Sequence, residues 1–197
     1  MGYHRAGFAV TGVDKFPMKN YPFTFIKADA LEILSDVSFC RGFDLIHASP
    51  VCKKYSAITK TAGTQAGHDD DIEAVRQKLQ AIGKPYVIEN VPGAPLKNYV
   101  ILCGTMFGLG VVRHRLFECN PEICFPPALC NHHKKVVKHG RPPDRHRNFA
   151  AVTGHFSDVA FAQESMGIDW MGQFGLSQAI PPAYTEWIGR EMLSKFG

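Results

Sequence analysis

The sequence predicts an α/β protein in which a largely parallel sheet is covered by helices on both faces. Two observations lead to this fold class: short apolar runs of strand length alternate with helix-like segments, and a complete helix signature separates two of the runs. The 197 residues suffice for one domain, or one domain with a small insertion, that buries a real core. No apolar run reaches the roughly 18 residues of a membrane span, so no membrane partner is expected.

Four predicted strands come first along the chain, and each ends at or carries a residue that could take part in catalysis or in ligand binding. The runs are "FAVTGVD", ending at Asp14, "FTFIKAD", ending at Asp29, "FDLIHASP", ending at Pro50, and "PYVIENVPG", which carries Glu89 and Asn90. Their length and apolar character are typical of buried strands. The strands of such a sheet bring their carboxyl ends together at one edge.

Two helices and two further strands complete the predicted order. The segment 69–85 has acids in its first turn, apolar residues at 72, 75, 79 and 82, and then Gly83 and Pro85, which together predict a helix. The segment 99–118 predicts two strands around a Gly-rich turn. The segment 180–196 predicts a closing helix that starts after a double proline.

A ligand crevice is expected at the carboxyl ends of the strands, where Asp14, Asp29, Cys52 and Glu89 would converge. Each of these residues also has a simpler interpretation. Asp14 could only turn the chain, Asp29 could cap a helix over 30–34, and Cys52 could be a buried thiol.

Positive charge is concentrated in one segment. From Arg113 to Arg147, eight Lys/Arg oppose three acids, whereas the whole chain has a net charge of only +4. A basic surface confined to one region indicates a phosphate-binding face. A solvated loop is the alternative.

The six cysteines are too few and too unevenly spaced for a disulfide scaffold, and the N-terminus lacks the apolar core of a secretory signal, so a reducing cytoplasm is expected. Cys40 and Cys103 are expected to be buried apolar residues. A zinc site remains open within a group of cysteines and histidines, although its C-x4-C-x5-C-x-H spacing is not a tight zinc pattern and no metal ligand is assigned. The group is Cys119, Cys124, Cys130, His132, His133 and His139.

Five motifs occur in a fixed order: "GYHRAGFAVTGVD", "ASPVCKKYS", "ENVPG", "RHRLFE" and "QAIPPAYTEWIG". Together the series resembles the DNA cytosine-5 methyltransferases, particularly the compact kind found in bacteriophage genomes. The resemblance covers about residues 2–118 and 161–190. It implies a doubly wound, mostly parallel Rossmann-like methyltransferase sheet. It also implies three parts: a catalytic core over 1–112, a small basic target-recognition segment over 113–155, and a C-terminal segment over 156–197 that returns to the core.

The resemblance implies covalent catalysis on cytosine in double-stranded DNA. A Cys52 thiolate would add to C6 of a flipped base, which makes C5 nucleophilic. Glu89 would hydrogen-bond N3 and the exocyclic amine, and Arg115, with Arg113 beside it on the same face of a strand, would reach O2. The alternative for the two arginines is a solvated pair on an edge strand.

The methyl donor implied by the resemblance is S-adenosylmethionine. Asp14 would hold its ribose hydroxyls and Asp29 its adenine edge, while Pro50 and Gln178 would line the cofactor side. The chain departs from the family at three points. Val51-Cys52-Lys53 replaces the usual Pro-Cys-Gln, and Gln178 stands where the family has asparagine. The third is that the sequence begins after the family's first strand and its Phe-x-Gly-x-Gly-Gly loop, so a start about 30 codons upstream is expected.

A different class of function fits the same motifs. A catalytically silent DNA-binding protein of this fold, such as an anti-restriction factor, would bind DNA without Cys52 and without S-adenosylmethionine. Transfer of another one-carbon group and an RNA target are further alternatives. The target sequence and the oligomeric state have no recognisable signature in the chain.

Overall fold

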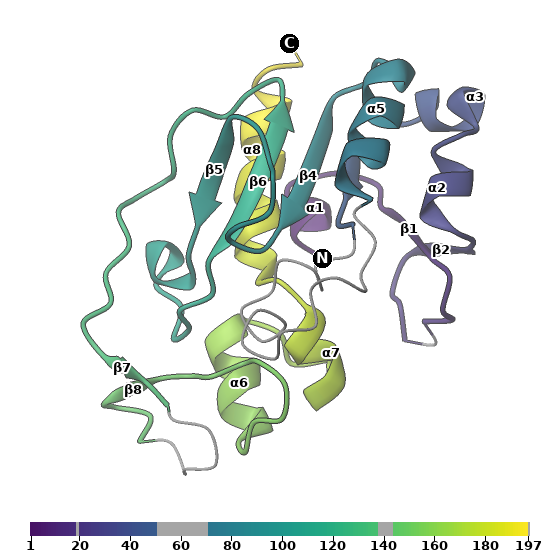
Figure 1. Ribbon diagram of the computed structural model, residues 1–197. Coiled ribbons are helices and arrows are strands. Elements are labelled where there is room, and N and C mark those ends of the chain that lie inside the picture. Colours follow the sequence, from purple (N-terminus) through teal and green to yellow (C-terminus); the bar gives the residue numbers. More distant parts are fainter. Residues whose placement is uncertain (19, 51–70, 138–143, 197) are drawn as a thin grey trace. The chain divides into compact units, whose positions relative to one another are not determined.

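The computed structural model describes residues 1–18, 20–50, 71–137 and 144–196. It divides into two compact units, which are described separately (Figure 1). Unit 1 consists of Met1–Phe8, Ile101–His114 and Phe125–Gly197. Unit 2 consists of Ala9–Val100 and Arg115–Cys124. The basic segment expected over 113–155 therefore contributes to both units.

Unit 2 contains most of the strands that the sequence predicted. Its elements are β1 (Thr11–Asp14), β2 (Thr24–Lys27), α2 (Ala30–Ile33), α3 (Val37–Arg41), β3 (Ile46–Ala48), α5 (Ile72–Ile82), β4 (Tyr86–Asn90) and β6 (Arg115–Asn120). Strand β5 (Tyr99–Leu102) runs from unit 2 into unit 1. Helix α5 ends as predicted, because Gly83 takes the left-handed conformation (φ 74°) that glycine adopts without strain.

The strands form small sheets of mixed direction. Strands β1 and β2 form a parallel pair, and the larger sheet has the order β3-β4-β6-β5. In that sheet β3 pairs with β4 in parallel, whereas β6 runs antiparallel to β4. The α/β class is thus confirmed, but the described residues do not form a single, mostly parallel sheet. Local apolar patterning fixes each strand and leaves open which edges pair.

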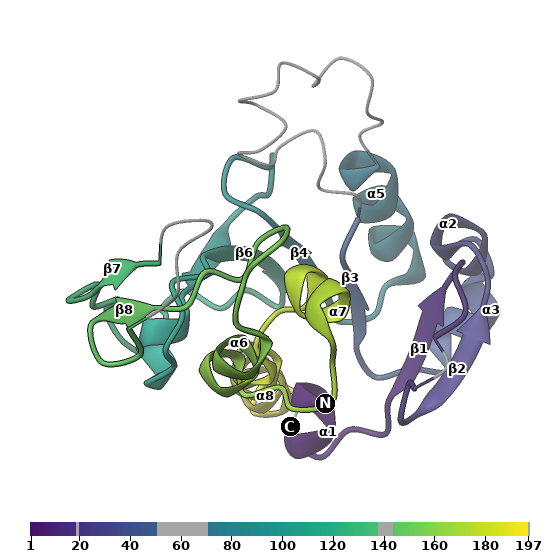
Figure 2. The same cartoon turned by 90° about the horizontal axis from the view of Figure 1, so that it is seen from below.

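One face of the larger sheet carries the core of unit 2. The apolar residues of α5 at 72, 75, 79 and 82 lie on one side of the helix and pack with Tyr86, Ile88 and Leu116 of the sheet in one buried cluster. Figure 2 shows α5 beside β3 and β4. These three sheet residues point to the same face because side chains alternate along each strand. The spacing seen in the sequence therefore corresponds to a real interface.

A buried ion pair lies on this same core face. The Arg76 guanidinium binds the Glu118 carboxylate through two hydrogen bonds, from Nε to Oε1 and from Nη2 to Oε2, each 2.8 Å long. The Lys97 backbone N–H also donates to Glu118, and Arg76 contacts Glu73 and the Pro95 carbonyl. Glu118 raises the pKa of Arg76 above its ordinary value. Paired in this way, the two charges satisfy each other away from water.

Unit 1 is mainly helical. Its elements are α1 (Gly2–Arg5), η2 (Gly104–Phe107), β7 (Lys135–Val136), β8 (Asn148–Phe149), α6 (Val159–Met166), α7 (Gln173–Gln178) and α8 (Pro182–Leu193). Helix α8 is the predicted closing helix, with a proline in its first turn. A buried cluster that includes Val111, Phe161 and Met166 forms the core of this unit.

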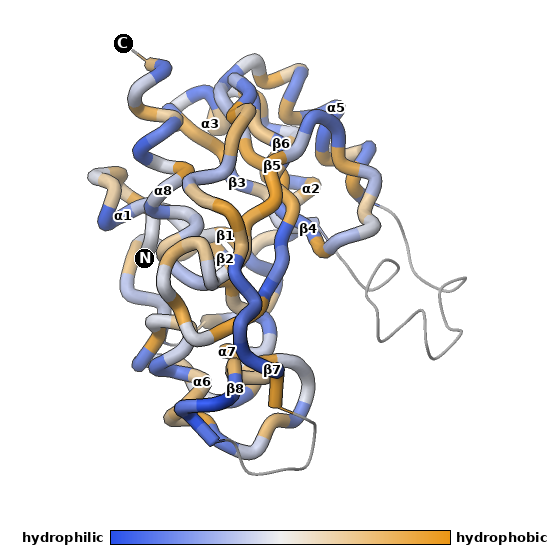
Figure 3. The backbone as a smooth tube through the Cα atoms, turned by 90° about the vertical axis from the view of Figure 1, so that its left-hand side faces the viewer, coloured by the Kyte–Doolittle hydropathy of each residue, from blue (hydrophilic) through white to orange (hydrophobic). Residues whose placement is uncertain are grey.

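The polar part of unit 1 lies around two short parallel strands, β7 and β8. Figure 3 shows hydrophilic residues around β8. Within the part of the chain that the structure describes, no helix is both long and apolar enough to cross a membrane.

Candidate active site

The carboxyl ends of β3 and β4 lie side by side. The two strands are parallel, with Ala48 opposite Ile88. Beyond them, the Asn90 side chain donates from Nδ2 to the Pro50 carbonyl over 3.1 Å, and its Oδ1 accepts from the Val91 N–H over 2.9 Å. Asn90 therefore ties the segment that leaves β3 to the end of β4.

Glu89 lies on the face of the sheet opposite the α5 core, because it alternates with Ile88 and Asn90. Its cross-strand partner is Phe117, so Arg115, two residues away on β6, is its diagonal neighbour. Arg115 Nε lies 3.0 Å from Glu89 Oε1, and both side chains are largely buried. The sequence paired these two residues by resemblance, and the structure brings them into direct contact.

His47 belongs to the same face of the sheet. It lies opposite Val87 in the register of β3 and β4, and its ring packs edge-on against Phe117. Its Nε2 lies 3.1 Å from Ser49 Oγ. Burial lowers the pKa of His47 from 6.5 to about 4, so the imidazole is neutral at pH 7. The charges on this face therefore come from Glu89 and Arg115 rather than from the histidine.

The predicted nucleophile, Cys52, lies outside the described residues, as do the adjacent Lys53 and Lys54. Pro50 is the last described residue before it.

Asp14 and Asp29 follow the parallel strands β1 and β2. Asp14 Oδ1 accepts from the Phe16 N–H over 2.8 Å, so it turns the chain. Asp29 Oδ1 accepts from the Leu31 N–H over 2.8 Å and caps α2. The turn at Asp14 and the cap at Asp29 are thus present in the structure, and the proposed contacts of these aspartates with a cofactor stay a prediction.

Arg113 and Gln178 belong to unit 1. The Arg113 guanidinium donates to the Val152 carbonyl over 2.6 Å and to the Ser177 carbonyl over 2.8 Å, while Tyr184 donates to the Arg113 carbonyl over 2.7 Å. The Gln178 side chain donates to Ser177 Oγ over 3.2 Å.

Two sequence interpretations of Arg113 and Arg115 are wrong. Strand β6 begins at Arg115, so the two arginines are not neighbours on one strand. They are not a solvated pair either, because Arg113 is buried among backbone carbonyls and Arg115 is paired with Glu89. The Arg113 contacts give it a structural role at the entrance to β6.

Several arginines of the basic segment are paired with acidic side chains, so fewer of its positive charges are available to bind phosphate than its composition suggested. Arg145 pairs with Asp158 and Glu164 and stacks on Phe161, and Arg147 pairs with Asp144. The Phe161 N–H, followed by Arg145, lowers the pKa of Asp158, which keeps this partner ionised. Lys134 and Lys135 are the exposed or partly exposed lysines of the segment that the structure describes.

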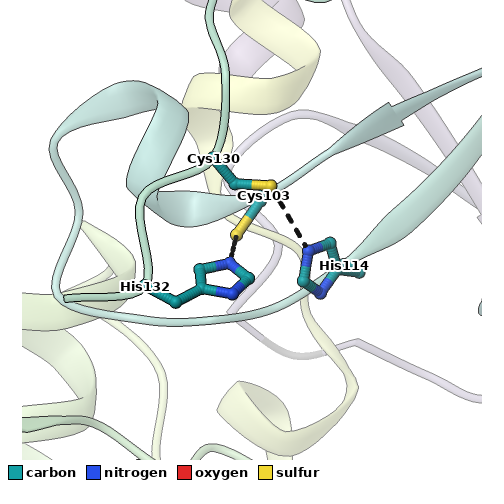
Figure 4. Close-up of side chains that lie close together, drawn as sticks. All are labelled: Cys103, His114, Cys130 and His132. Carbon is teal, nitrogen blue, oxygen red and sulfur yellow. Dashed lines mark hydrogen bonds between the residues drawn. The ribbon is translucent and has the colours of Figure 1, made fainter. Parts of the chain in front are cut away.

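The cysteines and histidines that lie close together in unit 1 are not the set that the sequence suggested. Cys130 and His132 meet Cys103 and His114, whereas Cys119 lies buried in β6 and Cys124 is exposed (Figure 4). Cys103 is buried as expected, but its sulfur faces His132 rather than an apolar neighbour. His114 was not predicted; its signal in the sequence is its position eleven residues after Cys103, together with the pair His132 and His133 farther along.

Comparison with known proteins adds no relative: no family model and no curated protein matches this chain. The function is therefore argued from the residues and their geometry.

Proposed function

We propose that this chain is a DNA cytosine-5 methyltransferase with a Rossmann-like, doubly wound arrangement of its strands, acting on a cytosine flipped out of double-stranded DNA. The observation that carries the proposal is the Glu89–Arg115 pair, which lies beside the Asn90 bond to Pro50. An acid and a guanidinium held at one strand end, next to the segment that leads to a cysteine, supply the three groups that this chemistry needs.

The distance along the chain supports the assignment of Cys52. Cys52 stands two residues after Pro50 in the sequence. Pro50 is fixed to Asn90, the residue after Glu89. The described segment that leads to the proposed nucleophile is therefore bonded to the strand that carries the proposed acid.

The proposed reaction balances in two steps. The Cys52 thiolate would add to C6, which makes the C5=C6 electron pair available at C5. C5 would then take the methyl group from a bound sulfonium donor, whose S–CH3 bond breaks and which leaves as a neutral thioether. A base then removes the proton from C5, and the electron pair expels the thiolate. Glu89 hydrogen-bonds N3 and the exocyclic amine of the adduct, while Arg115 donates to O2. The ion pair holds both groups in position before the base arrives.

The residues proposed for S-adenosylmethionine suit its adenosine half. Asp14 and Asp29 are carboxylates at the ends of neighbouring parallel strands, where they would accept hydrogen bonds from ribose hydroxyls and from the adenine amine. Each is oriented by a backbone N–H on Oδ1. Pro50 would line the cofactor side. When bound, the cofactor supplies the methyl group.

The first test follows the thiolate step without the methyl donor. Duplex DNA tritiated at C5 of cytosine releases tritium to water when a thiolate adds at C6 and C5 is reprotonated. We expect release with the parent chain, background release with Cys52→Ser, and parental release with Cys124→Ser, which removes an exposed thiol. Glu89→Gln should lower the rate by about 100-fold or more.

Tritium release that is equal in the parent and in Cys52→Ser contradicts the proposal. A companion measurement of duplex binding then decides for the alternative. Salt-sensitive binding that is unchanged by Cys52→Ser and by S-adenosylmethionine supports a catalytically silent DNA-binding protein. Label transferred from S-adenosylmethionine to DNA by the parent, and by Cys124→Ser but not Cys52→Ser, supports the complete reaction.

A further inference from the structure

Four potential metal ligands in unit 1 come from three places in the chain. Cys103 follows β5 and precedes η2, His114 precedes β6, and Cys130 and His132 lie in the segment that leads to β7. Their ligand atoms all lie within 4.8 Å of one another. Figure 4 shows both sulfurs and both imidazole rings directed toward a common centre.

The separations resemble those around a tetrahedral ion. Cys103 Sγ lies 3.4 Å from His132 Nε2, and Cys130 Sγ lies 3.7 Å from His114 Nε2. A zinc ion with Zn–S of about 2.3 Å and Zn–N of about 2.0 Å places a sulfur and a nitrogen roughly 3.5 Å apart at the tetrahedral angle. The ligand atoms all lie within 4.8 Å of one another, so binding would shorten the longest separation by at most about 1.5 Å, which side-chain rotation can supply.

The type of ligand selects the metal. Two thiols and two imidazoles are borderline-soft donors that suit zinc, whereas magnesium and calcium prefer oxygen ligands. Because the protein supplies four ligands, no coordination position is left for a substrate. Such a closed set is the pattern of a structural site rather than a catalytic one.

Simple hydrogen bonding is the competing explanation, and the surrounding segment argues against it. Residues 125–133 form no helix or strand and include the exposed Phe125 (81% exposed) and Leu129 (89% exposed). A segment that exposes such side chains gains little from apolar burial, so other contacts must fix it. Isolated hydrogen bonds contribute only about 1 kcal/mol each, which is comparable with the entropy lost by ordering one residue.

Thr105 supports the arrangement from outside the four ligands. Its Oγ1 lies 3.4 Å from Cys103 Sγ and accepts from the Asn131 N–H over 3.1 Å. Asn131 stands between the two ligands Cys130 and His132. The threonine therefore links the buried ligand to the segment that carries the exposed ones, as outer partners commonly do around metals.

We propose that Cys103, His114, Cys130 and His132 bind one zinc ion that fastens residues 125–133 to the start of η2. The proposal is independent of methyl transfer, since all four ligands lie in unit 1. The ion holds Lys134 and Lys135, which follow His132 after one intervening residue, at a fixed place in that unit.

The experiment measures metal in the full chain. Purified protein is stripped with a chelator, reloaded with zinc, dialysed and analysed by mass spectrometry of the metal. We expect about one equivalent of zinc in the parent. Cys130→Ser and His132→Asn should each lower retention at least tenfold. Both change exposed residues, so the fold should tolerate them.

Matched variants outside the site provide the control. Cys124→Ser removes another exposed thiol, and His133→Asn removes a histidine that packs on Phe149, so both should retain about one equivalent. Cobalt in place of zinc gives a second readout: thiolate-to-cobalt absorption should appear in the parent and fall at least tenfold in Cys130→Ser. Substoichiometric zinc in the parent, or equal loss in the control variants, overturns the proposal.

Discussion

The two units bring polar groups together by different means. In unit 2, Arg76 and Glu118 bind each other inside an apolar core that a helix and a sheet enclose. In unit 1, Cys103, His114, Cys130 and His132 converge where one contributing segment has exposed apolar side chains and no regular structure. The first cluster is complete within the chain, whereas the second, in our proposal, is completed by an ion.

This difference predicts two kinds of stability. A complete internal pair contributes a free energy that does not depend on the concentration of free metal, and breaking it leaves a buried charge. A cluster completed by an ion is stabilised by mass action, so its contribution depends on the concentration of free metal. Mutation should therefore lower the stability contributed by the Arg76–Glu118 pair. A chelator should lower the stability contributed by the cysteine and histidine cluster.

The largest effect is expected for Arg76→Ala. Removing the guanidinium leaves the buried Glu118 carboxylate without its cation, so we expect the free energy of unfolding to fall by about 3–5 kcal/mol. Urea denaturation measures it. The matched control is Arg190→Ala, which breaks an exposed pair with Glu186 and should cost less than about 1 kcal/mol. Equal losses in the two variants would mean that burial does not distinguish these pairs.

Metal removal should come next in size and should act on unit 1. With free zinc at 100 times its dissociation constant, binding stabilises the folded protein by about 2.7 kcal/mol, and a chelator removes this contribution. Hydrogen exchange should show faster exchange of amides in 125–137 after chelation. Exchange in α5 and β4 should change little. Faster exchange of α5 to the same degree would contradict a site confined to unit 1.

Acid should weaken unit 2 through His47. Its pKa is about 4 in the folded protein and 6.5 ordinarily, so the unfolded chain binds the proton first as the pH falls. Stability is therefore complete above pH 6.5 and is lost between pH 6.5 and 4. We expect a loss on the order of 2 kcal/mol, less than the full shift implies because the ring is partly exposed.

The measurement is urea denaturation of zinc-free protein at pH 7.5 and 4.5. The metal must be absent because acid also protonates cysteine and histidine ligands and releases zinc. His47→Asn keeps a polar side chain but does not titrate in this range, so its stability should depend less on pH. An identical pH dependence in the variant would show that another group is responsible.

The sequence predicted features that depend on local patterns better than features that depend on contacts between distant residues. The spacing 72, 75, 79 and 82 predicted α5 correctly, because helical periodicity is a local property. Arg76 lies three residues before Leu79 and four after Ile72, which places it on the buried face of the helix. The same spacing could therefore have predicted that Arg76 is buried. Glu89 was predicted at a strand end, and the structure adds its contact with Arg115.

Long-range geometry accounts for what the sequence did not predict. Cys103 and His132 are 29 residues apart, and only the fold makes them neighbours. The zinc site suggested by the sequence included Cys119 and Cys124. Both cysteines belong to unit 2, Cys119 within β6 and Cys124 shortly after it. Similarly, the strands β1 to β6 were predicted from local patterns, but the pairing of β4 with an antiparallel β6 depends on contacts between distant residues.

The smallest effect tests a residue with two interpretations. Asp29 caps α2, and a cap of this kind contributes about 1 kcal/mol, which Asp29→Ala should remove. Asparagine caps as well as aspartate, so Asp29→Asn should keep the stability while removing the charge. If Asp29 also holds the adenine amine, Asp29→Asn should weaken S-adenosylmethionine binding in a calorimetric titration without changing urea denaturation. Unchanged binding in the asparagine variant would leave the cap as its demonstrated role, and the cofactor assignment at β2 would fall.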